Sequence, residues 1–101
     1  MNTVVVRYRC KPDLADQNQL LVEDVFAELA ASDPGGIRYA TFRLADDTFV
    51  HIAETDDNNT LGTVEAFARF QDGLAQRCEE PPSPQPAQLV GSYRFNIAAN
   101  S

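Results

Sequence analysis

The apolar positions of the chain follow two periods in turn, one typical of strands and one typical of helices. Residues 3–9 (TVVVRYR) are β-branched and aromatic with partial alternation, which predicts a first strand. Apolar residues at helical spacing predict a helix over about residues 14–32. The run Asp33-Pro34-Gly35-Gly36 ends that helix, because it combines a proline ring with flexible glycines.

The middle of the chain reads as a hairpin followed by a second helix. Strands are predicted at residues 37–44 and 48–55, joined by the polar turn Ala45-Asp46-Asp47. After a polar loop, Val64, Phe67, Phe70 and Leu74 recur at helical spacing and predict a helix that runs toward Cys78.

The C-terminal part begins with a proline-rich stretch. Residues 79–86 (EEPPSPQP) are expected to form an extended connection, largely without helix or ladder pairing, since proline cannot donate a backbone hydrogen bond. Residues 87–96 (AQLVGSYRFN) are predicted to be the last strand. We expect one domain over residues 1–97, with a frayed tail at 98–101.

The predicted order βαββαβ is that of an α+β, ferredoxin-like domain. Right-handed crossovers place both helices on one face of a four-stranded antiparallel sheet. The apolar residues of the other face then lack cover within the chain. A second copy packed through this sheet face would bury them, so a homodimer is expected.

Composition narrows the classes of partner. The 101 residues include 8 Lys and Arg against 15 Asp and Glu, a net charge of −7. An acidic protein is a poor partner for the nucleic-acid backbone or an anionic membrane surface. The start of the chain does not have the pattern of a signal peptide, and no apolar run reaches the ~20 residues of a membrane span, so a cytoplasmic location is expected.

Several segments together resemble a known superfamily. They are the strand leading into Lys11-Pro12-Asp13, the segment Pro34 to Tyr39, the strand Phe49 to Glu54, and the short aromatic helix that follows. In these the chain resembles the dimeric α/β-barrel superfamily, specifically its antibiotic-biosynthesis-monooxygenase-like proteins. The segment 77–82 (RCEEPP) is also similar to small actinobacterial proteins of unassigned function.

The resemblance implies a homodimer whose sheets form a barrel, with one pocket in each subunit. It implies oxygenation of polyketide-type aromatics without metal or flavin, or haem degradation, and many members have no known activity. Glu54 is the position that it carries across. The family often has a tryptophan after this glutamate and a histidine on the second helix; this chain has no tryptophan and has Phe67 and Phe70 in that helix.

His51 is the only histidine and the candidate catalytic base. Val50 and Ile52 are the better candidates for the face that the helices cover, so the period of two places His51 on the opposite face. The same reasoning turns Arg7 and Arg94 to that face, where they would hold an anionic oxygen. If Phe49 and His51 instead face the helices, this cluster does not form. The alternative is that these residues form ion pairs across the dimer or face water, as such groups more often do.

Aromatic residues supply a second candidate site. Tyr8, Tyr39 and Tyr93 are expected to line a pocket between sheet and helices, with phenylalanines that would stack on a flat ligand. Ordinary core packing is the favoured interpretation for the phenylalanines, whereas for the tyrosines the two interpretations are about even. Tyr39 is the expected ligand contact, and Asn59 is expected to reach the pocket mouth. The loop around Asn59 lacks the spacing of a calcium loop, so no metal site is expected.

The two cysteines, Cys10 and Cys78, are predicted to lie at the same edge of the sheet. A disulfide between them is geometrically feasible, but a cytoplasmic location favours free thiols.

Two hypotheses of function follow. The first is a cofactor-independent monooxygenase that acts on a small aromatic or polyketide-like compound. The second is a non-catalytic dimer that binds a small ligand or a partner protein, which the missing tryptophan and histidine favour. Haem binding is a third possibility that would require His51 as the axial ligand.

Overall fold

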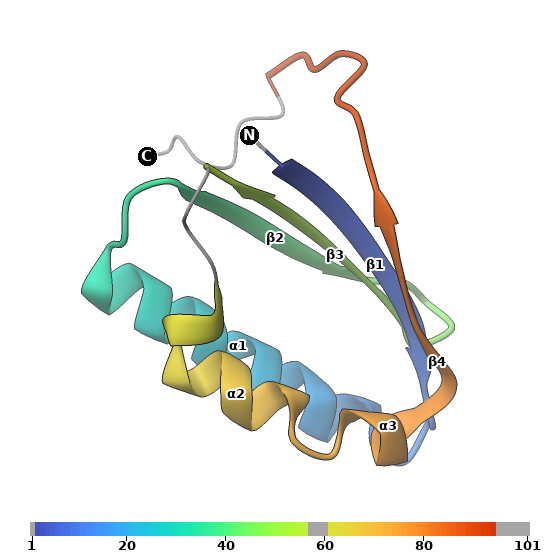
Figure 1. Cartoon of the computed structure of the whole chain (residues 1–101). Helices are drawn as coiled ribbons and strands as arrows, with labels where there is room; N and C mark the ends of the chain where they lie inside the picture. Colours follow the sequence, from blue (N-terminus) through green and yellow to red (C-terminus); the bar gives the residue numbers. More distant parts are fainter. Residues whose placement is uncertain (1, 57–60, 95–101) are drawn as a thin grey trace.

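A computed structural model describes residues 2–56 and 61–94 of the chain. Its elements are, in order, β1 (Asn2–Cys10), α1 (Ala15–Ser32), β2 (Ile37–Arg43), β3 (Thr48–Thr55), η1 (Leu61–Thr63), α2 (Glu65–Gln71), α3 (Leu74–Arg77) and β4 (Cys78–Pro86). The strands form one antiparallel sheet in the order β2-β3-β1-β4, and the helices lie on one of its faces (Figure 1). The predicted ferredoxin-like α+β fold is therefore confirmed.

The β2–β3 hairpin has the predicted polar turn. Asp47 adopts a left-handed backbone conformation with φ of 66°, which aspartate tolerates better than most residues. The Thr48 N–H donates to the Asp46 carboxylate at 3.0 Å, and the Leu44 N–H donates to the Thr48 carbonyl at 2.8 Å. Side-chain and backbone bonds thus close the turn and set the register of the two strands.

The fourth strand corrects the sequence prediction. The proline-rich stretch is not an unpaired connection: it forms β4 and pairs with β1, while residues 87–94 lie outside any strand. The Ala87 N–H donates to the Thr3 carbonyl at 2.8 Å, and N–H groups alternate sides along an antiparallel strand. Gln85 and Ser83 therefore face β1, and Pro84 and Pro86 face the open edge of the sheet. An edge strand tolerates proline in that orientation because no ladder bond is lost.

The second helical region is broken rather than continuous. The backbone turns at Gly73, whose φ of 79° is easily adopted only by glycine, and α3 begins in a new direction. Cys78, expected near the end of this helix, instead starts β4.

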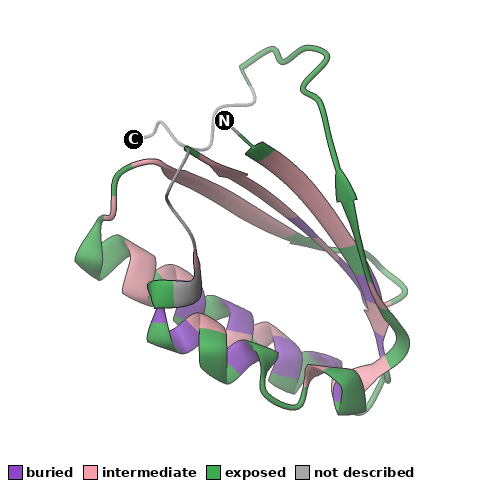
Figure 2. Cartoon of the chain, viewed as in Figure 1, coloured by how far each residue is buried: buried purple, intermediate pink, exposed green. Residues whose placement is uncertain are grey.

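Burial is concentrated where the helices meet the sheet. Figure 2 shows buried residues along α1 and α2 and at the ends of the strands nearest to them, whereas the opposite strand ends are intermediate or exposed. The buried hydrophobic residues are Tyr8, Cys10, Ala15, Val22, Val25, Phe49, Val64, Ala66 and Phe70. The core is thus formed by α1 and α2 against β1 and β3.

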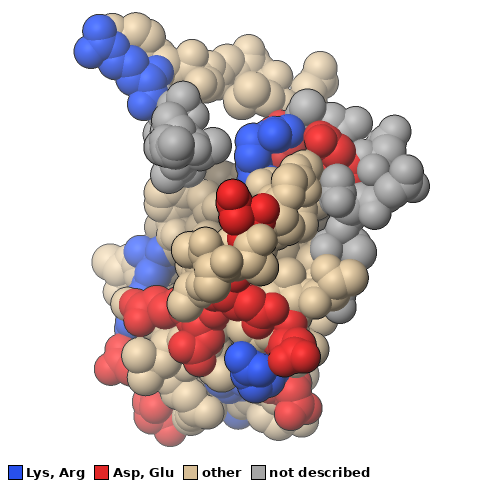
Figure 3. All heavy atoms as spheres, turned by 90° about the vertical axis from the view of Figure 1, so that its left-hand side faces the viewer, with Lys and Arg blue, Asp and Glu red and all other residues tan. Residues whose placement is uncertain are grey.

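Acidic side chains gather over the lower part of the face viewed in Figure 3, where the helices lie. Glu23 and Asp24 on α1 and Glu65 on α2 are exposed. No helix among the described residues is long and apolar enough to cross a membrane.

Cys10 and Cys78 are directly opposite each other in β1 and β4, and both are free thiols. Burial, reinforced by the neighbouring Cys78, raises the pKa of the Cys10 thiol to about 11. A thiol held protonated in this way is slow to react.

The paired proline strand can be tested at Gln85, whose N–H faces β1. We expect Gln85→Pro to lower the free energy of unfolding by about 1–3 kcal/mol relative to Gln85→Ala, since proline leaves a carbonyl of β1 without its donor. Urea denaturation of both variants measures this difference. Equal stability of the two variants would contradict the pairing of β4 with β1.

Candidate functional site

A cavity of about 280 Å³ lies between the sheet and the second helical region. It is lined mainly by apolar and aromatic side chains from all four strands and from η1, α2 and α3: Val6, Tyr8, Tyr39, His51, Ala53, Leu61, Phe67, Phe70, Gln71, Leu74, Pro82 and Pro84. A mostly apolar hollow with a few polar groups is the usual form of a site for a small organic molecule.

His51 lies in the wall of this cavity, on the face of the sheet that the helices cover. The prediction that it faces away from the helices is wrong. The register pairs His51 with Val6 and Phe49 with Tyr8, so these residues share one face, and Val50 and Ile52 occupy the other. The His51 ring lies 5.3 Å from the Phe70 ring of α2, and its side chain is buried.

Both ring nitrogens of His51 contact hydroxyl groups. Nε2 lies 2.7 Å from the Tyr8 hydroxyl, while Nδ1 lies 2.5 Å from the Tyr39 hydroxyl and 3.1 Å from the Thr41 hydroxyl. The three hydroxyls come from β1 and β2, the strands on either side of β3. Cross-strand neighbours thus place them around the imidazole.

The network continues into the helical layer. Asn18 of α1 donates from Nδ2 to the Tyr8 hydroxyl at 2.9 Å, and its Oδ1 accepts from Arg77 Nε at 2.9 Å. Arg77 also donates to the backbone carbonyls of Phe70 and Asp72. Asn18 and Arg77 are buried, with exposed fractions of 0% and 5%. This polar chain therefore joins α3, α1 and three strands through the core.

Burial controls the charge of the ring groups. It lowers the pKa of His51 to about 4, so the imidazole is neutral near pH 7. It raises the pKa of Tyr39 to about 12 and also raises the pKa of Tyr8. The hydroxyls and the imidazole are thus neutral dipoles, able to donate or accept hydrogen bonds to a ligand.

Two residues that the sequence grouped with His51 lie elsewhere. Arg7 is exposed and shares the uncovered face with its partner Val50. Arg94 is beyond β4, exposed, with its guanidinium 5.3 Å from the Tyr93 ring. Their predicted convergence with His51 is wrong for two reasons. The strand at residues 48–55 turns His51 toward the helices, and the last strand is formed by residues 78–86 and not by residues 87–96.

Of the other residues that the sequence singled out, only some reach the cavity. Tyr39 and Tyr8 line the cavity as expected, whereas Tyr93 is 80% exposed and does not. Asn59 lies outside the described residues. Glu54 is on the uncovered face, where a hydrogen bond from Arg38 lowers its carboxyl pKa.

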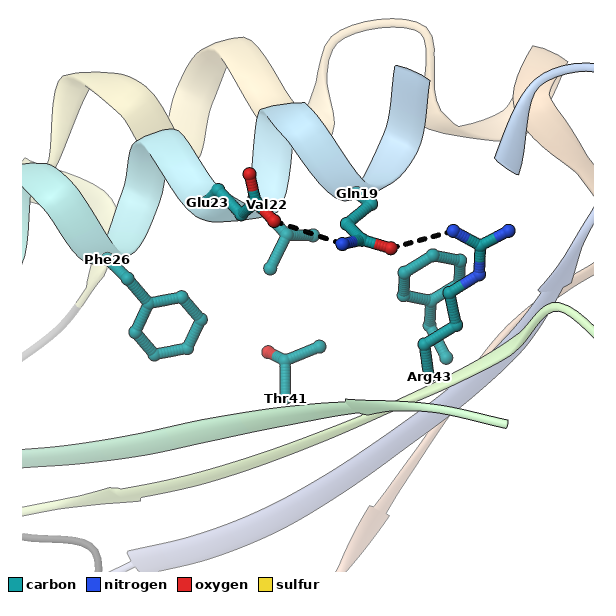
Figure 4. Close-up of a pocket in the computed structure, with 7 residues that line it drawn as sticks. Gln19, Val22, Glu23, Phe26, Thr41 and Arg43 are labelled. Carbon is teal, nitrogen blue, oxygen red and sulfur yellow. Dashed lines mark hydrogen bonds between the residues drawn. The ribbon is translucent and has the colours of Figure 1, made fainter. Parts of the chain in front are cut away.

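A second hollow of about 240 Å³ lies between α1 and β2 (Figure 4). Gln19 bridges its rim, donating to Glu23 and accepting from Arg43. Arg43 is already paired with Asp16 and Asp47, so its charge is compensated. Thr41 lines this hollow and also contacts His51, so the Thr41 hydroxyl lies between the two hollows. The first cavity is the better candidate site because His51, Tyr8 and Tyr39 line it.

Asn18 and Arg77 were missed by sequence reasoning. Asn18 nevertheless has a signal: it shares the buried side of α1 with Ala15, Val22 and Val25, at helical spacing. A polar residue within an apolar stripe needs a buried partner. Nothing local to Arg77 identifies that partner, because the two residues are 59 positions apart.

Comparison with known proteins bears on the fold. No protein-family model and no curated protein matches the sequence. Solved structures do match. One of them, named antibiotic biosynthesis monooxygenase, has a TM-score of 0.71 and 20% identity over 90% of this chain and 100% of its own.

Two further matches carry no activity in their names. The protein Rv0793 from Mycobacterium tuberculosis has a TM-score of 0.72 and 12% identity, over 90% of this chain and 96% of its own. The protein NE2512 of unknown function from Nitrosomonas europaea has a TM-score of 0.64 and 17% identity, over 91% of each chain. This chain therefore has the ferredoxin-like fold of the antibiotic-biosynthesis-monooxygenase-like proteins, as the resemblance of its sequence implied.

Proposed function

We propose that the protein is a cofactor-independent monooxygenase that binds a small aromatic or polyketide-like compound in the cavity beside His51. The observation that carries the proposal is the cavity itself, where an apolar aromatic wall meets the hydroxyl network of a neutral histidine. The Phe67 and Phe70 rings, 5.9 Å apart, offer stacking surfaces for a flat ligand. The structural likeness to a protein named antibiotic biosynthesis monooxygenase supports the same reading.

The reaction would convert a reduced ring position into a carbonyl. A CH₂ group and one O₂ give C=O and one H₂O. The substrate first loses a proton to solvent and then reacts as the anion. The protein's part would be to hold the ring, exclude water and stabilise the anionic oxygen with hydrogen bonds. In this proposal Tyr39 contacts the substrate and His51 orients Tyr39.

A non-catalytic binding role is the second candidate, and one observation favours it. Both nitrogens of His51 are already bonded to hydroxyls, and its pKa of about 4 makes it a weak base near neutral pH. The same bonds argue against haem, since an axial ligand needs an unshared ring nitrogen.

We also propose that a second copy of the chain packs on the uncovered face of the sheet. Val5, Ile52 and Ala40 are register partners and form an apolar row across three strands on that face. Beyond β4, Leu89 and Val90 are 69% and 97% exposed, which is a further apolar surface. A homodimer would bury both surfaces.

The cavity can be tested by filling it. We expect reduced quinones and anthrones to cause oxygen uptake with the wild type, and Ala53→Leu to abolish it because the added methyl groups occupy the ring site. Ala75→Leu, at an exposed position of α3, is the matched control and should retain uptake. Binding without uptake in the wild type would favour the non-catalytic role, and uptake unchanged in Ala53→Leu would exclude this cavity as the site.

The dimer can be tested with a charge placed in the apolar row. We expect Ile52→Lys to convert a dimer to a monomer in sedimentation velocity, since a buried lysine without a partner is costly. Gln17→Lys adds the same charge on the exposed side of α1 and should leave the dimer intact. A wild type that sediments as a monomer at micromolar concentration would contradict the proposal.

The neutral state of His51 makes stability depend on pH. Its pKa is about 4 in the folded chain against an ordinary 6.5, so the unfolded state alone takes up a proton between these values. The stabilisation is therefore complete above about pH 6.5 and decreases as the pH falls toward about 4.

Between about pH 7 and pH 5, we expect the free energy of unfolding of the wild type to fall by roughly 2 kcal/mol more than that of His51→Gln. Urea denaturation at each pH measures the difference, and the Gln variant removes the contribution of the carboxylates that both proteins share. Parallel pH profiles would show that His51 is not held neutral by burial.

A further inference from the structure

The direction of the hydrogen bonds around His51 is set at the buried Arg77. A guanidinium group only donates, so the Asn18 atom that faces Arg77 Nε at 2.9 Å must be the amide oxygen. The other end of that amide is then the NH₂ group, which donates to the Tyr8 hydroxyl at 2.9 Å. The donor chemistry of Arg77 thus determines which atom of the Asn18 amide is the oxygen and which is the nitrogen.

The Tyr8 hydroxyl passes this direction to His51. Its oxygen accepts from Asn18, and its hydrogen cannot return to the amide nitrogen, which has no available lone pair. Among the described residues its other partner is His51 Nε2, at 2.7 Å, which can accept this hydrogen. His51 is neutral, and with Nε2 as the acceptor its single ring hydrogen is on Nδ1.

Nδ1–H in turn donates to the oxygens of Tyr39 and Thr41, at 2.5 and 3.1 Å. The hydrogen of the Tyr39 hydroxyl must therefore point away from His51, either to Thr41 or to a ligand, and Tyr39 lines the cavity. A hydroxyl that accepts one hydrogen bond is a stronger donor of the next. Every donor in the chain points from the charge on Arg77 toward Tyr39.

We infer that Arg77 and Asn18 are positioning residues that hold His51 as the Nδ1–H tautomer and thereby make Tyr39 a hydrogen-bond donor to the ligand. The site then selects flat aromatic compounds that present an acceptor oxygen, namely a ring carbonyl, a phenolate or an enolate. This inference rests on the proposed function, because it names the ligand class of the same cavity. In this inference the network stabilises an oxyanion, and His51 does not remove a proton from the substrate.

The tautomer can be measured without any ligand. In ¹⁵N NMR of the labelled wild type near neutral pH, we expect Nδ1 to resonate as the protonated ring nitrogen and Nε2 as the unprotonated one. Asn18→Asp is the decisive variant, because a carboxylate accepts from both Arg77 and Tyr8. Tyr8 would then accept from His51, and the two nitrogen resonances should exchange roles. Tyr93→Phe, at an exposed hydroxyl, should leave them unchanged.

A wild type with the hydrogen on Nε2 overturns the inference, whether or not the protein oxidises any compound. A folded Asn18→Asp variant with unchanged resonances overturns it as well. If that variant does not fold, the wild-type spectrum alone decides. Loss of oxygen uptake bears only on the proposed function, so the two failures can be told apart.

The ligand class is tested with 4-nitrophenol, whose absorbance reports its ionisation. Since a hydrogen bond to a charged oxygen is worth more than one to a neutral oxygen, we expect the wild type to bind the phenolate roughly tenfold or more tightly than Tyr39→Phe does. Asn18→Asp, in which the direction of the hydrogen bonds is reversed, should bind the phenolate as weakly as Tyr39→Phe does. Absence of binding to the wild type, or equal phenolate affinity in Tyr39→Phe, overturns the assigned ligand class.

Discussion

The buried charge of Arg77 is the constraint on which the rest of the structure depends. Its hydrogen bonds, as far as the described residues show, go to neutral oxygens: the carbonyls of Phe70 and Asp72 and the amide of Asn18. The carbonyls lie at the C-terminal end of α2, where the helix dipole favours a cation. The guanidinium carbon also lies 5.6 Å from the centroid of the Phe70 ring. Burying a charge is costly unless every donor is satisfied, so these groups must be held in place together.

That requirement explains the break between α2 and α3. A continuous helix would carry position 77 onward along the axis of α2, away from the carbonyls at its end. The left-handed Gly73 turns the chain, so that Arg77 points back to the carbonyls of Phe70 and Asp72. The Arg77 carbonyl also accepts from the Lys11 N–H at 2.8 Å, which ties this corner to the end of β1. The same corner starts β4, whose Pro82 and Pro84 then form one wall of the cavity.

The topology could be predicted from the sequence because each element carries its own local pattern. The residues that decide the site could not, for three physical reasons. Phe49, Val50, His51 and Ile52 are all large, so the period of two separates the faces of β3 but does not say which one the helices cover. Proline usually interrupts a strand, and Pro84 and Pro86 are compatible with pairing only because their nitrogens face the open edge of the sheet. The partner of Asn18 is supplied by the tertiary fold, 59 residues away.

These corrections change the kind of chemistry that the site can support. Arginines beside an exposed histidine would have provided mobile charges in water, which screens them. The structure instead has one fixed charge in the core and a line of neutral dipoles that ends at the cavity. Dipoles that are already oriented need no rearrangement when negative charge develops on a ligand, and a dry apolar wall strengthens their effect. The low pKa of His51, which makes it a poor base, is an advantage for this role. A neutral imidazole can accept from Tyr8 and donate to Tyr39 at once, whereas an imidazolium only donates and could not accept from Tyr8.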